Sequence, residues 1–104
     1  IIIDDGSKDN SVHKIQEMTS LCDERFVQFE FRHRPNKGLC NTLNEALEWC
    51  QGEYYSVIAS DDIMLKNKTA IQVEFLNKNK SVLAVFGGIK LIDENNRELS
   101  ERLS

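Results

Sequence analysis

The sequence predicts an α/β fold in which parallel strands alternate with helices. Along its 104 residues, strand-like and helix-like patterns alternate, which is typical of a parallel sheet with helical crossovers. In addition, two apolar strand-like runs end in adjacent carboxylates, Asp4 with Asp5 and Asp61 with Asp62. Ligands of open α/β sheets bind outside the carboxyl ends of the strands. The two acidic pairs therefore predict a binding site at that edge of the sheet.

The predicted strands are apolar or alternating runs bounded by turn residues. The opening run is β-branched, the stretch "RFVQFEFR" alternates between apolar and polar residues, and "EYYSVIAS" is again largely apolar. Two further runs, "SVLAVFGG" and "IKLID", are followed by the turn "DENNRE" and a polar tail. Strands are therefore expected at residues 1–3, 25–32, 53–60, 81–88 and 89–93.

The predicted helices are segments whose apolar residues recur every three or four positions. Asp9, Asn10 and Ser11 are candidates to cap the first helix, because short polar side chains accept hydrogen bonds from free N–H groups. Gly52 stands where the C-terminal cap of the second helix is expected. The helices are expected at residues 12–22, 39–50 and 67–79.

The composition is that of a single small globular domain. Hydrophobic residues make up 40% and charged residues 29%, and the net charge of −4 argues against a nucleic-acid partner. No apolar run approaches the roughly 18 residues of a membrane span. The unpaired cysteines fit neither zinc binding nor a disulfide framework, and Cys40 and Cys50 are expected to be small buried apolar side chains. A reducing, cytoplasmic setting is expected.

A buried strand is an unusual beginning for a chain. Residues 1–3 are apolar, and no methionine or polar segment precedes them. We therefore expect that a segment has been removed and that residues 1–104 form one partial domain. The loss of a neighbouring strand would expose a sheet edge, so self-association of this fragment is also expected.

The first acidic pair permits two interpretations. Asp5 and Gly6 are a common turn pair, so Asp4, Asp5 and Gly6 together could simply form a turn. Alternatively, one carboxylate accepts hydrogen bonds from a ligand, while Gly6 allows the backbone to approach closely. The residue pattern favours neither interpretation.

The second acidic pair carries a stronger functional signal. Asp61 and Asp62 are adjacent, and their mutual repulsion needs an offset from a cation or from hydrogen-bond donors. Mg²⁺ and Mn²⁺ take oxygen ligands and commonly bridge carboxylates to substrate phosphates. The alternative is that Ser60 or Asp61 caps the next helix.

The stretch "RPNKG", residues 34–38, is a turn by composition. Lys37 or Arg34 could nevertheless face a phosphate or a base. Gly38 would open the following helix and leave free N–H groups at an end that favours anions. Neither the GxxxxGK[ST] nor the GxGxxG spacing of known phosphate-binding loops is present.

Taken together and in this order, the stretches resemble the family-2 inverting glycosyltransferases with the GT-A fold. That family typically shows a strand ending in "DDGS.D", an "N.G......N.A" segment, then "GEY", and then "DSDD" or "SDDI". The corresponding stretches here read "IIIDDGSKDNS", "NKGLCNTLNEA" and "GEYYSVIASDDIML", followed by "FGGIKLID". The resemblance covers nearly all of the chain. It implies a Rossmann-like, three-layer α/β/α sheet that lacks its first strand and its C-terminal part.

The resemblance also implies roles for particular residues. Asp5, or Asp4 beside it, would help to hold the nucleotide base, usually uracil, and Lys37 would approach the nucleotide. Asp61 would bind a divalent cation, Mn²⁺ or Mg²⁺, that bridges the diphosphate, and Asp62 would assist through the ribose or by supporting the metal ligands from behind. The implied donor is a nucleotide sugar such as a UDP-sugar, transferred with inversion to a glycan or lipid-linked acceptor. In the whole protein this would occur in the cytoplasm or at the cytoplasmic face of the membrane.

The chain departs from the family pattern in two places that bear on the site. Ala59 replaces the first acid of the usual Asp-x-Asp, so the metal site has one carboxylate fewer. Lys66 replaces a proline often found after the acidic segment. The catalytic base of the family comes from a region beyond Ser104, and Asp93 and Glu94 are interpreted as turn residues. This fragment by itself is expected to be inactive.

Two other classes of function remain open. "DDGS" is faintly similar to the DxDGT loop of haloacid-dehalogenase-type phosphatases, although Asp4 and Asp5 are adjacent rather than separated by one residue. The chain could also be a non-catalytic α/β interaction module, in which the acids are caps or relics. Such a module would bind no nucleotide.

Overall fold

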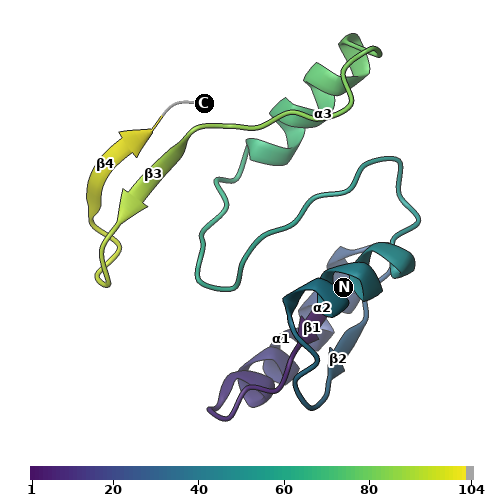
Figure 1. Ribbon diagram of the computed structural model, residues 1–104, viewed down its shortest axis with the longest axis vertical. Helices are drawn as coiled ribbons and strands as arrows, with labels where there is room; N and C mark the ends of the chain where they lie inside the picture. The colour runs from purple at the N-terminus through teal and green to yellow at the C-terminus, as the bar shows by residue number, and fades with distance from the viewer. Residues whose placement is uncertain (103–104) are drawn as a thin grey trace. The chain divides into compact units, whose positions relative to one another are not determined.

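The computed structural model describes residues 1–102. The chain divides into two compact units, Ile1–Tyr55 and Ser56–Ser104, and each is described by itself. Figure 1 labels the elements of both units. The assignment of the chain to one partial domain stays a prediction.

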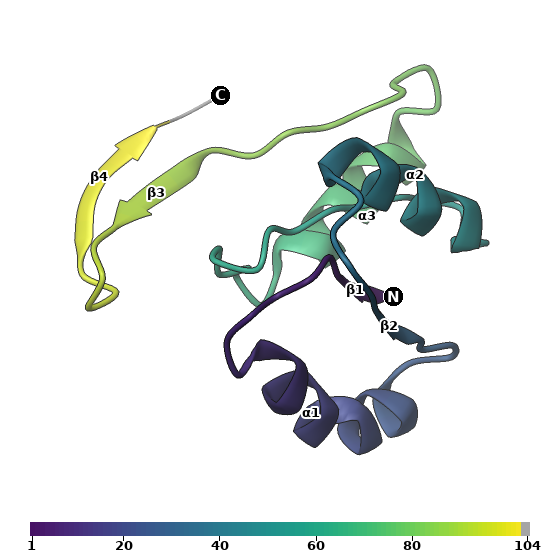
Figure 2. The ribbon, with the colours of Figure 1, turned by 60° about the horizontal axis from the view of Figure 1, so that its bottom comes forward.

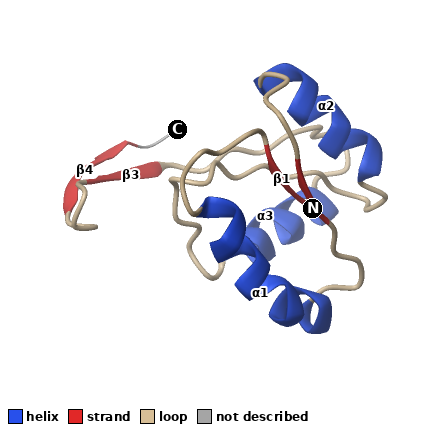
Figure 3. Ribbon diagram, turned by 90° about the horizontal axis from the view of Figure 1, so that it is seen from below, coloured by secondary structure: helices blue, strands red, loops and turns tan. Residues whose placement is uncertain are grey.

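The first unit is a β-α-β crossover followed by a second helix. Its strands are parallel, with Ile2 opposite Phe31 and Asp4 opposite His33. Helices α1 and α2 lie on opposite sides of the strand pair (Figures 2 and 3). The α/β class predicted from the sequence is thus confirmed, here in a sheet of two strands. The elements are β1 (Ile2–Asp4), α1 (Ser11–Arg25), β2 (Phe31–His33) and α2 (Leu39–Trp49).

Helix α1 extends beyond the predicted residues 12–22 at both ends and shortens the next strand. Its first turn is fixed by Asp9, whose Oδ1 accepts hydrogen bonds from the backbone N–H and the hydroxyl of Ser11. At the other end, the N–H of Phe26 donates to the carbonyl of Cys22 at 3.0 Å. The helical hydrogen bonding therefore continues into "RFVQFEFR", and the predicted strand at residues 25–32 is wrong for residues 25–30, since β2 begins at Phe31.

Helix α2 follows the prediction for residues 39–50 closely, but not its cap. The N–H of Cys50 donates to the carbonyls of Ala46 and Leu47, each at 3.2 Å, so the helix ends there and not at Gly52. Cys40, in the first turn of the helix, is exposed rather than buried, and Cys50 is half-buried. The prediction that Cys40 is a small core residue is therefore wrong.

The second unit contains one helix and one hairpin. Helix α3 (Lys68–Lys78) confirms the prediction for residues 67–79. Strands β3 (Ile89–Ile92) and β4 (Glu98–Arg102) pair antiparallel around a turn in which the N–H of Asn96 donates to the carbonyl of Asp93 at 3.0 Å. Residues 98–102 of the polar tail, for which no strand was predicted, thus form β4.

Two predicted strands do not form. Residues 53–60 and 81–88 are apolar enough for strands, but no described segment pairs with them. A strand needs a neighbour that satisfies its N–H and C=O groups, and this requirement cannot be read from the strand's own residues. The parallel sheet expected from the sequence is therefore reduced, in the described residues, to the parallel pair β1–β2 and the separate antiparallel pair β3–β4.

The described part of the chain contains no fully buried apolar side chain, and Asp4 is its one buried residue, at 7% exposure. A single globular domain of this composition is expected to bury a modest apolar core, and this expectation is wrong for residues 1–102. None of the described helices is long and apolar enough to cross a membrane. Large apolar side chains on all three helices remain exposed, among them Met18, Leu21, Leu39, Leu47, Ile71 and Phe75.

Candidate functional site

The loops that follow β1 and β2 meet at one edge of the first unit. We call residues 4–7, "DDGS", the acidic loop and residues 34–38, "RPNKG", the basic loop. Because β1 and β2 are parallel, their carboxyl ends lie at the same edge. The N–H of Arg34 continues this pairing by donating to the carbonyl of Asp4 at 3.3 Å. The structure thus brings together the predicted site residues Asp4, Asp5 and Lys37.

Asp4 shapes the acidic loop from within. Its Oδ1 accepts hydrogen bonds from the N–H groups of Gly6 at 3.1 Å and Ser7 at 2.8 Å, and its Oδ2 accepts one from the hydroxyl of Ser7. These bonds, above all the one from the Ser7 hydroxyl, lower the pKa of Asp4 despite its burial. Most of the acceptor capacity of Asp4 is therefore used by the loop.

Asp5 joins the acidic loop to the basic loop. Its Oδ1 accepts from the N–H of Lys37 at 2.9 Å and its Oδ2 from the N–H of Gly38 at 3.0 Å. The side-chain amide of Asn36 donates to the Asp5 carbonyl at 2.9 Å. The bond from the Lys37 amide is the main reason why the pKa of Asp5 is lowered.

Helix α2 therefore has an anion at its N-terminus, and that anion belongs to the chain itself. The N–H groups at such an end favour negative charge, and the Asp5 carboxylate accepts from the two that immediately precede Leu39. The sequence indicated an anion-favouring end at Gly38 but did not indicate that Asp5 occupies it. A carboxylate has about four acceptor positions, so Asp5, which accepts from the Lys37 and Gly38 amides and also interacts with the Thr42 side chain, keeps capacity for a ligand.

Glycine allows the two loops to approach this closely. Gly6 has φ +96°, and a Cβ at this position would lie 2.8 Å from the backbone nitrogen of Asn36. Gly38 has φ +90°, again a conformation that favours glycine. Both glycines are thus required by the backbone at the junction of the loops.

Replacing Gly6 by alanine is expected to separate the loops and to destabilise the first unit by about 1–3 kcal/mol, because the methyl group meets backbone that cannot turn aside. Urea unfolding at neutral pH, followed by circular dichroism, measures the change in the free energy of unfolding. Gly52→Ala is the control, since its Cβ would meet only the Tyr54 carbonyl at 3.5 Å. Equal stability of Gly6→Ala and the wild type would contradict the close packing of the loops.

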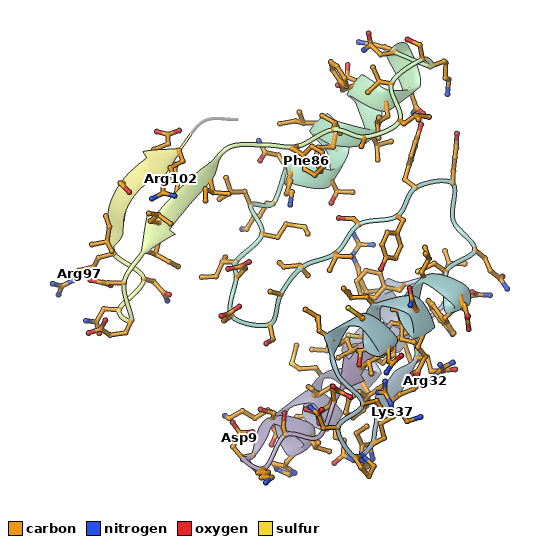
Figure 4. The ribbon with its side chains drawn as sticks, viewed as in Figure 1. Asp9, Arg32, Lys37, Phe86, Arg97 and Arg102 are labelled. Atoms are coloured by element: carbon orange, nitrogen blue, oxygen red, sulfur yellow. The ribbon has the colours of Figure 1, made fainter. Side chains whose placement is uncertain are left out.

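The side chains of the two basic residues in the basic loop differ in exposure and in ion pairing. The Arg34 side chain is 13% exposed, and its Nη2 lies 3.9 Å from Asp5 Oδ1 and 3.2 Å from Glu45 Oε1. Lys37 is exposed and forms no ion pair with any described residue. Figure 4 labels Lys37 on the first unit, close to α2. Of the two cations, Lys37 is the one that solvent and a ligand can reach.

Asp61 and Asp62 lie in an exposed turn of the second unit. The N–H of Asp62 donates to the carbonyl of Ala59 at 3.1 Å, which closes the turn. Helix α3 begins at Lys68, after Asn67, so neither Ser60 nor Asp61 caps it and that alternative is wrong. The described residues contain no group of three or more potential protein ligands for a metal. A cation held here would need ligands from its substrate as well as from the two carboxylates.

Asp93, which lies before Glu94 in the hairpin turn, has a structural role. Its Oδ1 accepts from the N–H groups of Asn95 at 2.8 Å and Arg97 at 2.9 Å. This agrees with its interpretation as a turn residue. The sequence reasoning missed a different group, Thr42 and Glu45 on α2, both of which contact Arg34. Their spacing of three on a helix was the available signal.

Comparison with known proteins identifies the family. The model of the family described as glycosyl transferase family 2 matches residues 1–103. The chain belongs to this family. The match covers both loops and the Asp61–Asp62 turn, so the resemblance seen in the sequence is confirmed.

Relatives of this family 2 chain include proteins of known and unknown specificity. It is 35% identical over 101 residues to an uncharacterised glycosyltransferase of Rickettsia felis, covering 95% of this chain and 16% of the relative. It is 32% identical over 91 residues to a poly-β-1,6-N-acetyl-D-glucosamine synthase of Staphylococcus epidermidis, covering 88% of the chain and 21% of the relative. No solved structure matches the chain significantly.

A third relative is named for its donor and acceptor. It is the UDP-Glc:α-D-GlcNAc-diphosphoundecaprenol β-1,3-glucosyltransferase of Escherichia coli, 28% identical over 95 residues, which cover 91% of this chain and 35% of the relative. In all three comparisons the chain spans little more than a third of the relative, or less.

Proposed function

We propose that this family 2 chain is the nucleotide-sugar-binding part of an inverting glycosyltransferase with the GT-A arrangement. The donor is a UDP-sugar, and the acceptor is a glycan or a lipid-linked sugar. The family match supports sugar transfer. A relative whose name includes UDP-Glc and a diphosphoundecaprenol acceptor supports this choice of donor and acceptor. A polysaccharide synthase among the relatives is consistent with a glycan product.

The observation that carries the proposal is the junction of the acidic and basic loops. Asp5 presents a carboxylate with remaining acceptor capacity and a 20% exposed side chain. An acceptor of this kind suits the N–H of a uracil ring. Lys37 adds an exposed cation within the same junction, suited to the negative charge of a nucleotide. Asp4 contributes by holding the loop in shape.

The Asp61–Asp62 turn is the proposed metal-binding element. Its two carboxylates offer the hard oxygen ligands that Mg²⁺ and Mn²⁺ prefer, and such ions usually complete their coordination with substrate phosphates and water. The donor set therefore fits a cation shared with a diphosphate, with Asp61 as the ligand and Asp62 directed toward the ribose. A bound cation would stabilise the charge on the departing nucleoside diphosphate.

The catalytic base and the acceptor site are proposed to lie outside these residues. Among the described residues, Asp5 is the one carboxylate at the junction of the two loops that a ligand can reach, and it is assigned to the nucleotide base rather than to proton transfer. A phosphotransfer reaction is not favoured, because the buried Asp4 carboxylate already accepts three hydrogen bonds and is poorly placed to act as a nucleophile. Cytoplasmic location and self-association of the fragment stay predictions.

Nucleotide binding can be mapped on this chain by NMR. Addition of UDP with Mg²⁺ is expected to shift the backbone amide signals of Asp5, Lys37 and Gly38, since the ligand meets the junction of the loops. Lys37→Gln should weaken the interaction, while Lys14→Gln on the exposed face of α1 should not. Shifts confined to other regions, or no shift at saturating UDP, would contradict the proposal.

A further inference from the structure

A network of charged side chains links the acidic loop, β2 and α2. We propose that Arg34 and Glu45 are positioning residues for the nucleotide site, which hold the Asp5 carboxylate on the N–H groups of the basic loop. This inference rests on the proposed function of that site. The charged network consists of Asp5, Arg34, Glu45, Arg32 and Glu30.

Arg34 lies beside Asp5 without bonding to it directly. The Nη2 atom of Arg34 is 3.9 Å from Asp5 Oδ1, which is within range of charge attraction but too long for a hydrogen bond. The same Nη2 donates to Thr42 Oγ1 at 3.1 Å and lies 3.2 Å from Glu45 Oε1. Helix α2 therefore determines where the positive charge next to Asp5 is held.

Glu45 is the principal anchor of that guanidinium. The Nε and Nη1 atoms of Arg34 are buried and have no hydrogen-bond partner among the described residues, so Nη2 makes all of its polar contacts. The hydroxyl of Thr42 accepts the hydrogen bond of Arg34 Nη2, and Glu45 holds the guanidinium through an ion pair. That hydroxyl donates its own hydrogen to the carbonyl of Gly38 at 2.9 Å. Thr42 thus also donates a hydrogen bond at the start of α2.

The second oxygen of Glu45 fixes Glu45 itself. Its Oε2 accepts a hydrogen bond from Arg32 Nη1 at 3.2 Å, and Arg32 also pairs through Nε with Glu30. Arg32 and Arg34 are two residues apart, which places their side chains on the same side of the extended chain. Glu45 is 25% exposed, and partial burial of this kind strengthens charge interactions relative to water. Glu45 is therefore held from two sides and cannot follow Arg34 if that side chain moves.

The expected consequence is an effect of Glu45 on nucleotide binding that operates through Asp5. If Arg34 leaves its place, Asp5 loses its neighbouring positive charge, and its hydrogen bonds to Lys37 and Gly38 weaken. Both the base-facing carboxylate and the start of α2 then become less ordered. Glu45 itself contacts neither the Asp5 carboxylate nor the start of α2. Its effect on nucleotide binding should therefore vanish when the Asp5 carboxylate is absent.

A double-mutant cycle on the whole chain tests this coupling. In UDP titrations with Mg²⁺, Glu45→Gln is expected to weaken binding about fivefold, the effect of losing one charge-assisted interaction. In the Asp5→Asn background, the same substitution should weaken UDP binding by less than about a further twofold. Glu48→Gln, an exposed glutamate on the same helix, is the matched control and should have no effect. A full fivefold loss in both backgrounds would overturn the proposal.

A measurement without nucleotide separates this inference from the proposed function. In the wild type, the amide proton signals of Lys37 and Gly38 should move as Asp5 titrates. Glu45→Gln should shift both signals toward the values of Asp5→Asn, Glu45→Asp should restore them in part, and the amides of α1 should stay unchanged. If Glu45→Gln leaves both amides and their titration as in the wild type, positioning is excluded whether or not the chain binds UDP. If these shifts appear and UDP does not bind, the proposed function alone fails.

Discussion

Replacing Asp5 by asparagine is expected to release the basic loop from the acidic loop. The carboxylate accepts from two backbone N–H groups, on Lys37 and Gly38, whereas an asparagine amide has one oxygen and would turn donors toward one of them. The start of α2 would also lose its anion. Hydrogen exchange of the Lys37 and Gly38 amides should become at least about tenfold faster, since each amide is protected mainly by its bond to Asp5.

The same variant should also change how stability responds to acid. The hydrogen bonds to Asp5 lower its pKa in the folded chain, chiefly the one from the Lys37 amide. A carboxyl group of this kind stabilises the fold at pH values above its unfolded pKa of about 3.9, and this contribution is lost as the pH falls through the lowered folded value. Between neutral pH and pH ~3, Asp5→Asn should therefore lose less stability than the wild type.

Urea unfolding at both pH values measures this difference. Asp23→Asn, a change of the same chemistry on the exposed side of α1, is the control and should respond to acid as the wild type does. Asp4 and Asp9, whose pKa values are also lowered by hydrogen bonds from Ser7 and Ser11, contribute to the sensitivity that both proteins share. Equal acid responses of Asp5→Asn and the wild type, with unchanged hydrogen exchange, would show that Asp5 does not hold the loops together.

Replacing Asp61 by asparagine is expected to remove the effect of divalent cations on UDP binding. The residue lies in an exposed turn, so the fold should be unaffected. The loss of its charge removes the proposed ligand that competes best for a hard cation. With Mn²⁺ present, UDP affinity should fall at least about tenfold, and without Mn²⁺ it should match the wild type. Asp62→Asn should have the smaller effect, and Asp23→Asn none. Undiminished Mn²⁺ dependence in Asp61→Asn would place the cation elsewhere.

The three helices could be predicted from the sequence because helical hydrogen bonds are local. Each bond joins residues four apart, so the spacing of apolar side chains carries nearly all the information needed for α1, α2 and α3. Strands depend on partners that are distant in the sequence. Residues 53–60 are largely apolar, like the opening run, yet only residues 2–4 of the opening run pair with another described segment. The strand β4, "ELSER", was missed because four of its five residues are polar or charged, in keeping with the exposure of the whole strand.

The position of the candidate site could be predicted from the sequence, but its hydrogen bonds and ion pairs could not. The parallel order of the strands placed the "DDGS" and "RPNKG" segments at one edge, and the structure agrees. That Asp5 bonds to the start of α2 depends on a contact across more than thirty residues, at separations of 32 and 33. No local pattern reports such a contact. The same holds for the link between Arg34 and Glu45, which appears only when α2 lies beside β2.

The most direct test of the account is a calorimetric titration of the wild-type chain with UDP, with and without Mn²⁺. The proposed nucleotide-sugar site predicts measurable binding that becomes at least about tenfold tighter when Mn²⁺ is present, since the cation joins the diphosphate to Asp61. Binding of UDP that Mn²⁺ does not strengthen would contradict the metal-bridged site. An absence of binding under both conditions would contradict nucleotide binding by this chain.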